Sequence, residues 1–161
     1  MHINALPSLI SGVADRPSTA SAAIITTEDG GLLLQHRDDI PGIWFPNYWG
    51  LFGGAIDEGE DPGAALVREL EEELGFRPRE VAYFTQVCFD LRRWNLGIRL
   101  RYIFTVASTR EELSTVKLNE GQAAKLFSKE DVFSVRRLTP YDAFALRLWM
   151  AQADLKHMPS A

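Results

Sequence analysis

The feature that most constrains the fold is a Gly-Gly pair followed by a helix whose two ends can both be read from the sequence. Asp61 is a favourable N-cap, and Pro62 suits the first helical position because its missing N–H would have no intrahelical partner there. Gly75 can adopt the left-handed conformation that ends many helices. The sequence therefore predicts a short strand, a glycine loop and then a helix between Asp61 and Gly75.

The predicted helix has an apolar face and an acidic flank. With successive residues about 100° apart, one arc holds Leu66, Val67, Leu70 and Leu74. Glu69, Glu72 and Glu73 are spaced i, i+3, i+4 and cluster beside that face. They lie near the C-terminal end, where the helix dipole makes each carboxylate unfavourable by about 0.3–1 kcal/mol. A divalent cation would compensate this charge, and Mg²⁺ and Mn²⁺ prefer oxygen ligands.

An acidic helix alone is more often a solvated surface than a metal site. The complete spacing favours the metal site: Gly54, five residues, Glu60, seven residues, and then the run from Arg68 to Phe76. This arrangement matches the Nudix box, G-x5-E-x7-R-E-U-x-E-E-x-G-U, at every fixed position. The chain therefore resembles the Nudix hydrolase family.

The resemblance implies both a fold and a reaction. The expected fold class is α/β, the Nudix α/β/α sandwich, in which a mixed, curved β-sheet lies between helices. Members of the family bind Mg²⁺ or Mn²⁺ and cleave a pyrophosphate linkage in a nucleoside diphosphate joined to another moiety. The expected protein is a metal-dependent pyrophosphohydrolase whose partner is a small nucleotide substrate.

The resemblance also assigns roles within the box. The metal ligands would be the Gly54 carbonyl oxygen and the carboxylates of Glu69, Glu72 and Glu73. Glu60 and Arg68 would orient these carboxylates through hydrogen bonds. Arg68 and the three helix glutamates are accordingly predicted to be catalytic.

A further carboxylate is predicted outside the helix, because ligands on one helical flank cannot surround an ion. The run Asn119-Glu120-Gly121-Gln122, followed by Ala-Ala-Lys-Leu-Phe-Ser, is similar to the E-G-Q-x4-W/F-x-S segment of the 8-oxo-dGTP-type, mutator-preventing branch. In that branch the glutamate completes the metal site or acts as the general base. Glu120 therefore joins the predicted catalytic and metal-binding residues, and Phe127 is expected in a strand beneath the site.

Substrate contacts are expected before the box. The L-L-x-x-R pattern that ends at Arg37 resembles the strand preceding the box in many Nudix enzymes, where an arginine can contact substrate phosphate. An ordinary exposed strand end is the alternative for Arg37. The following loop contributes Trp44, Tyr48 and Trp49, whose rings could stack on a nucleobase or belong to the core.

The remaining elements follow from residue patterns. Strands are predicted over residues 20–27, 32–37, 81–91 and 98–107, the first two joined by a hairpin turn and the last two forming an antiparallel pair. Cys88 is expected to be a buried strand residue. Arg99 and Arg101 alternate onto one face of the last strand, where solvent is the expected surrounding and a phosphate contact the alternative.

A C-terminal helix is predicted to begin at Thr139-Pro140 and to run to about residue 156. The side chains expected to pack against the sheet are Ala143, Phe144, Leu148 and Ala151.

Composition bounds the class of protein. A chain of 161 residues, 46% of them hydrophobic, is expected to form one Nudix domain over residues 19–157, preceded by a possibly flexible arm over residues 1–18 that could support a homodimer. The net charge of −5 argues against a nucleic-acid polymer as the main partner. Cys88 cannot form an internal disulfide by itself, so a cytoplasmic location is expected. No apolar run is long enough to span a membrane, so no membrane partner is expected.

The substrate has several candidates. The extra signatures of the NADH, ADP-ribose and diadenosine polyphosphate branches are absent. The Glu120 segment favours a nucleoside triphosphate, possibly oxidised, which would be cleaved to a monophosphate and pyrophosphate. A nucleotide-sugar hydrolase is the alternative. A non-catalytic nucleotide-sensing Nudix module is the alternative of another class, and the full set of box glutamates favours the enzyme.

Overall fold

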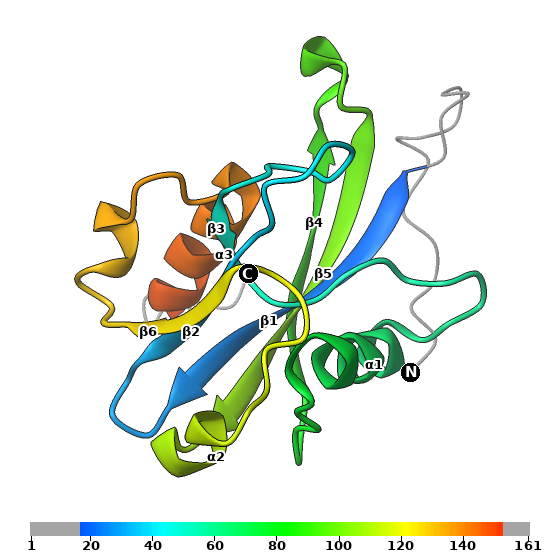
Figure 1. Ribbon diagram of the computed structural model, residues 1–161. Coiled ribbons are helices and arrows are strands. Elements are labelled where there is room, and N and C mark those ends of the chain that lie inside the picture. The colour runs from blue at the N-terminus through cyan, green and yellow to red at the C-terminus, as the bar shows by residue number, and fades with distance from the viewer. Residues whose placement is uncertain (1–16, 153–161) are drawn as a thin grey trace, which may run out of the picture.

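A computed structural model describes residues 17–152 of the chain, and within this range six strands form one mixed sheet (Figure 1). The strands are β1 (Ser18–Thr27), β2 (Leu32–His36), β3 (Trp49–Gly50), β4 (Ala82–Asp90), β5 (Ile98–Ser108) and β6 (Ala123–Phe127). The α-helices are α1 (Pro62–Leu74), α2 (Arg110–Ser114) and α3 (Pro140–Met150), and the 3-10 turns are η2 (Arg92–Trp94) and η3 (Val132–Ser134). Of the N-terminal arm predicted over residues 1–18, residues 1–16 lie outside the described residues, and Ser18 is the first residue of β1.

The sheet has β1 at its centre. The strand order is β3-β2-β1-β5-β4, and β6 also pairs with β2. β1 and β5 run parallel from the Ser18–Arg99 pair to the Thr27–Ser108 pair. β4 and β5 are antiparallel, as the sequence predicts for this pair, and β1 and β2 are antiparallel as well. α1 covers one face of the sheet and α3 covers the other, so the predicted α/β/α sandwich is confirmed (Figure 1).

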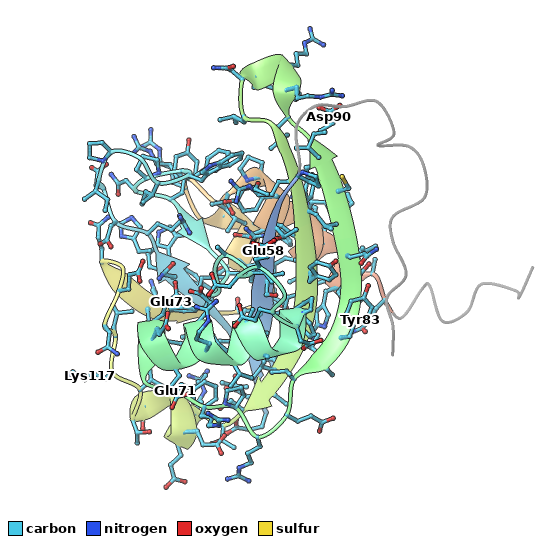
Figure 2. The ribbon with its side chains drawn as sticks, turned by 90° about the vertical axis from the view of Figure 1, so that its right-hand side faces the viewer. Glu58, Glu71, Glu73, Tyr83, Asp90 and Lys117 are labelled. Atoms are coloured by element: carbon cyan, nitrogen blue, oxygen red, sulfur yellow. The ribbon has the colours of Figure 1, made fainter. Side chains whose placement is uncertain are left out.

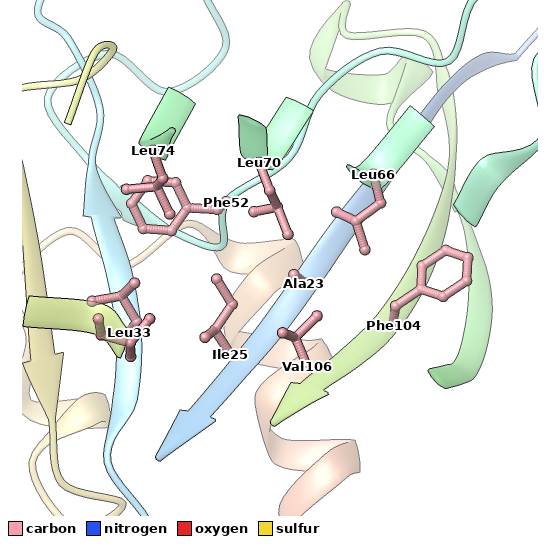
Figure 3. Close-up of a cluster of buried hydrophobic side chains, with 10 residues drawn as sticks. Ala23, Ile25, Leu33, Phe52, Leu66, Leu70, Leu74, Phe104 and Val106 are labelled. Atoms are coloured by element: carbon pink, nitrogen blue, oxygen red, sulfur yellow. The ribbon is translucent and has the colours of Figure 1, made fainter. Parts of the chain in front are cut away.

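Each face of β1 belongs to a separate hydrophobic core, because successive strand residues point to opposite faces. Ala23 and Ile25 face α1 and contact the cluster drawn in Figure 3, which includes Leu66, Leu70, Leu74, Phe52, Phe104 and Val106. Ala22 and Ile24 face α3. The two cores hold α1 and α3 against one rigid strand and so fix where the acidic flank of α1 lies.

Helix α1 begins and ends where the sequence predicts. The Asp61 carboxylate accepts hydrogen bonds from the N–H groups of Gly63 and Ala64, at 2.9 and 3.1 Å. Gly75 ends the helix with φ of 58°, and its N–H donates to the Glu71 carbonyl. Of the predicted apolar face, only Val67 is not fully buried.

The packing face predicted for the C-terminal helix is wrong. The residues of α3 that are buried against the sheet are Tyr141, Asp142, Ala145 and Leu146, whereas Phe144 is 47% exposed. Hydrophobicity alone misplaces this face because Asp142 is buried with partners from other segments: it accepts from the Leu51 N–H and forms an ion pair with Arg101. The end predicted at residue 156 lies outside the described residues.

Two further expectations for the β4–β5 hairpin are corrected. Cys88 is exposed, and it points to the face of the sheet opposite to that of its neighbour Phe89, which contacts Tyr141 and Phe144 of α3. Arg101 is not on a solvated face: it is 7% exposed and forms an ion pair with Asp142, since the start of α3 covers this part of the sheet. No helix in the described part of the chain is long and apolar enough to cross a membrane.

Candidate active site

A cavity of about 250 Å³ lies where α1, β2, the glycine loop and the loop before β6 meet. Its lining includes Gln35, Arg37, Gly54, Glu69, Glu73 and Glu120. These residues are far apart in the sequence, and the sheet brings them together because β2 pairs with β6 and α1 lies across β1. Three of the predicted carboxylates therefore share one cavity with the predicted phosphate-binding arginine.

Glu73 is the most deeply buried of these carboxylates, with 5% of the residue exposed. One carboxylate oxygen accepts from the Gly53 N–H at 3.0 Å, and the other accepts from Gln35 Nε2 at 3.1 Å. Burial raises the pKa of Glu73 to about 8, and the negative charges of Glu120 and Glu69 add to this rise. Figure 2 shows Glu73 and Glu71 on different sides of α1, which explains why Glu71 takes no part in the cluster.

Glu69 lies directly against the glycine loop. A Cβ atom at position 54 would collide with the Glu69 carboxylate, so any other residue there would displace this carboxylate from its present position. The Gly54 carbonyl oxygen, predicted as a metal ligand, accepts a hydrogen bond from the Ser21 N–H at 2.9 Å and keeps one lone pair. Burial raises the pKa of Glu69; the Arg68 contact opposes this rise, and the charges of Glu72 and Glu120 add to it.

Arg68 is held by a fork-shaped contact with Glu60. Its Nε and Nη2 atoms each donate to one Glu60 oxygen at 3.0 Å, and Nη2 also donates to the Ala55 carbonyl. Nη1 donates to Glu69 at 2.8 Å and to Glu72 at 3.3 Å. The guanidinium thus joins the loop to two of the helix glutamates, which is the contact pattern expected of an orienting pair. Glu72 is exposed and does not line the cavity.

Two polar residues that the sequence reasoning missed bring Glu120 to the helix. Gln35 is 3% exposed, and its Nε2 contacts both the Glu73 carboxylate and the Glu120 carbonyl, the latter at 3.3 Å. Asn119 donates from its side chain to the Glu72 carbonyl at 3.0 Å and from its N–H to the Glu73 carbonyl at 2.8 Å. The one signal for Gln35 was a polar residue directly after the apolar run Leu32–Leu34 of its strand.

The predicted substrate contacts divide into two groups. Arg37 lines the cavity, and its Nε donates to the Trp44 carbonyl at 2.9 Å. The rings of Trp44, Tyr48 and Trp49 do not line it. Trp44 instead covers the Arg99 guanidinium at 3.6 Å, and Trp49 stacks on His36 with ring centroids 4.7 Å apart. Tyr48 contacts Phe45 edge-on.

The residues of the cavity fit a hard divalent cation by their chemistry, although no three His, Cys, Asp or Glu side chains within residues 17–152 already form a complete ligand group. Glu69, Glu73 and Glu120 offer oxygen donors, and their mutual repulsion is the kind of charge imbalance that a cation relieves. Both Glu73 oxygens keep lone pairs beyond the hydrogen bonds that they accept.

The NUDIX domain family model matches residues 16–152. The chain belongs to the Nudix family. The nucleoside triphosphatase NudI of an Enterobacter species is 30% identical over 131 residues, which cover 66% of this chain and 92% of that protein. An RNA pyrophosphohydrolase of a Nitratiruptor species is 32% identical over 65% of this chain and 63% of its own length.

Other alignments of this Nudix chain are shorter. A CMP-5′-(N-acetyl-N-hydroxy-3-aminopropyl)phosphonate hydrolase of Streptomyces rubellomurinus is 38% identical over 65 residues, so the alignment spans 38% of this chain and only 30% of that relative.

Among solved structures, a MutT NUDIX hydrolase from Burkholderia pseudomallei superposes with a TM-score of 0.68 at 24% identity, over 83% of this chain and 98% of that one. This likeness confirms the Nudix fold.

Proposed function

We propose that this Nudix protein is a pyrophosphohydrolase that depends on Mg²⁺ or Mn²⁺ and cleaves a nucleoside triphosphate to a monophosphate and pyrophosphate. The observation that carries the proposal is the meeting of Glu69, Glu73 and Glu120 in one cavity that Arg37 also lines. Carboxylates that bind metal beside an arginine that binds phosphate suit the polyphosphate chain of a nucleotide.

The residues that would hold the metal are Gly54, through its carbonyl oxygen, and the carboxylates Glu69, Glu72, Glu73 and Glu120. A bound divalent cation supplies Lewis-acid stabilisation of the charge that develops on phosphate oxygens. Arg68 and Glu60 would keep the helix glutamates in place, because the guanidinium contacts both Glu69 and Glu72 while Glu60 fixes its plane.

The chain's own residues account for the proton in the reaction. The oxygen of a water molecule bonds to a phosphorus atom of the anhydride, the bond from phosphorus to the bridging oxygen breaks, and pyrophosphate leaves. The proton that the water loses passes to a carboxylate, for which we propose Glu120, since it comes from a loop rather than from the helix that carries the other ligands. Arg37 would donate hydrogen bonds to the phosphate oxygens.

The name of one relative, a nucleoside triphosphatase, supports a triphosphate substrate, and the name of another, an RNA pyrophosphohydrolase, supports cleavage of a pyrophosphate linkage. A nucleotide conjugate is the second candidate, since a further relative is named for a CMP-phosphonate substrate. Hydrolysis of a nucleotide sugar belongs to this second candidate.

The test measures phosphate and pyrophosphate release, with Mg²⁺ or Mn²⁺ and with EDTA, across triphosphates, oxidised triphosphates, nucleotide sugars, ADP-ribose and dinucleotides. We expect metal-dependent turnover of one class that falls by about 10- to 100-fold or more in Glu73→Gln. Glu71→Gln is the matched control, because this neighbouring glutamate is exposed and forms a surface ion pair with Arg77. Nucleotide binding without any turnover would support the non-catalytic sensing module instead.

A further inference from the structure

Arg37, which lines the cavity, and Arg99, which shares Trp44 with it, have no carboxylate partner in the part of the chain that the structure describes. Arg37 and Arg99 are both partly buried, yet no ion pair within residues 17–152 includes either of them. The chain does not lack acidic residues, since it has 22 of them against 17 basic ones. Removing an arginine from water without a counter-charge is unfavourable, so this arrangement points to an anion that residues 17–152 do not supply.

Trp44 holds both guanidiniums. Its carbonyl oxygen accepts from Arg37 Nε at 2.9 Å, and its ring covers the Arg99 guanidinium at 3.6 Å from the centroid. The Nε atom of Arg99 is buried and has no hydrogen-bond partner. The indole ring occupies one face of the Arg99 guanidinium, so a phosphate would approach this guanidinium along its edge, through the Nη groups.

The buried Asp142 carboxylate is paired with Arg101. Asp142 lies 3.1 Å from Arg101 Nη2, and its other oxygen accepts from the Leu51 N–H and the Thr139 hydroxyl. Arg101 is therefore neutralised, while Arg99 is not. Burial lowers the pKa of Arg99; Tyr141 opposes this fall, and the positive charges of Arg101 and Arg37 add to it.

We propose that Arg99, positioned by Trp44 beside Arg37, binds a phosphate group beyond the two that the scissile bond joins, so that the site selects nucleoside triphosphates over diphosphate conjugates such as nucleotide sugars. The proposal rests on the proposed function. It follows from placement: Arg37 lines the cavity, and Trp44, whose carbonyl accepts from Arg37, stacks on the Arg99 guanidinium. A third phosphate supplies the missing negative charge, whereas a sugar does not.

The kinetic test compares kcat/KM for a triphosphate and for a nucleotide sugar of the same base. In Arg99→Gln we expect the triphosphate value to fall by about 10- to 100-fold, the range of a lost charge-assisted contact, while the nucleotide-sugar value changes less than about threefold. Arg99→Lys keeps the charge without the planar fork and should lose less. Arg93→Gln is the control, because Arg93 is exposed on the same hairpin. Equal losses for both substrates, or no loss, would overturn the proposal.

A binding test keeps the selection separate from turnover. Calorimetry in Mg²⁺ with α,β-methylene triphosphate and diphosphate analogues, which are not cleaved at that bond, should show the triphosphate analogue binding at least about tenfold more tightly to the natural protein. Arg99→Gln should remove this preference. If the natural protein binds the triphosphate analogue more tightly but hydrolyses no nucleotide, the phosphate contact of Arg99 is supported and the proposed reaction is refuted. If it hydrolyses nucleotides but binds both analogues equally well, only the phosphate contact of Arg99 is refuted.

Discussion

Replacing Glu73 with glutamine should stabilise the metal-free protein at high pH. Glu73 is 5% exposed, and its pKa rises from the ordinary 4.5 to about 8 on folding. The folded chain thus binds a proton more tightly than the unfolded chain, so the stability that this proton contributes is fully present below pH 4.5 and is lost as the pH rises through 8. At 1.36 kcal/mol for each tenfold change in proton affinity, the ionised form weakens folding by up to about 5 kcal/mol at pH 9.

Glu73→Gln has the shape of the protonated acid and cannot ionise. We therefore expect the free energy of unfolding in EDTA to match the natural protein within about 1 kcal/mol at pH 5 and to exceed it by about 2–5 kcal/mol at pH 9. Urea denaturation at several pH values measures this difference. Adding Mg²⁺ should narrow or reverse this difference at pH 9, because the proposed metal binds the natural protein more tightly than the variant and so stabilises it more.

The control for this experiment is Glu71→Gln. This residue is two positions away on the same helix, exposed and paired with Arg77, so its replacement should change stability by less than about 0.5 kcal/mol at any pH. If Glu73→Gln follows the same pH profile as the natural protein, then burial and the neighbouring carboxylates do not perturb Glu73, and the electrostatic reasoning for the site is wrong.

Two further substitutions test the contacts that hold the site. Asp142→Ala leaves Arg101 buried without its counter-charge and should lower the free energy of unfolding by about 3–5 kcal/mol in urea denaturation, against less than about 1 kcal/mol for Asp90→Ala in an exposed pair. Asn119→Ala removes a hydrogen bond to the C-terminal end of α1, so stability should fall by only about 1 kcal/mol while kcat falls by about tenfold or more; an unchanged kcat would show that the loop before β6 needs no such anchor.

The helix of the box could be predicted in detail because everything that defines it is local. The cap at Asp61, the stop at Gly75 and the clustering of Glu69, Glu72 and Glu73 depend on neighbours within a few residues and on the fixed geometry of the α-helix. The antiparallel pairing of β4 with β5 could be predicted as well, since two β-rich runs joined by a short connection usually form a hairpin.

The C-terminal helix shows where such reasoning ends. The first residue of this helix follows from the Thr139-Pro140 pair. Its buried face does not follow from hydrophobicity, because Asp142 is buried through contacts with residues that lie far away in the chain. The Leu51 N–H that donates to it is 91 residues away, and Arg101 reaches it from another strand. A pattern of apolar residues carries no information about such partners.

The sequence by itself determined the family, the helix with its acidic flank and the residues of the box, since these features repeat at spacings that a single helix and its preceding loop impose. Only the tertiary structure decided which distant groups join them: Gln35 beside Glu73 at a separation of 38 residues, Asn119 at the end of α1, and Trp44 between Arg37 and Arg99. These contacts depend on strand order and register across the sheet, which long-range packing fixes and local propensity does not.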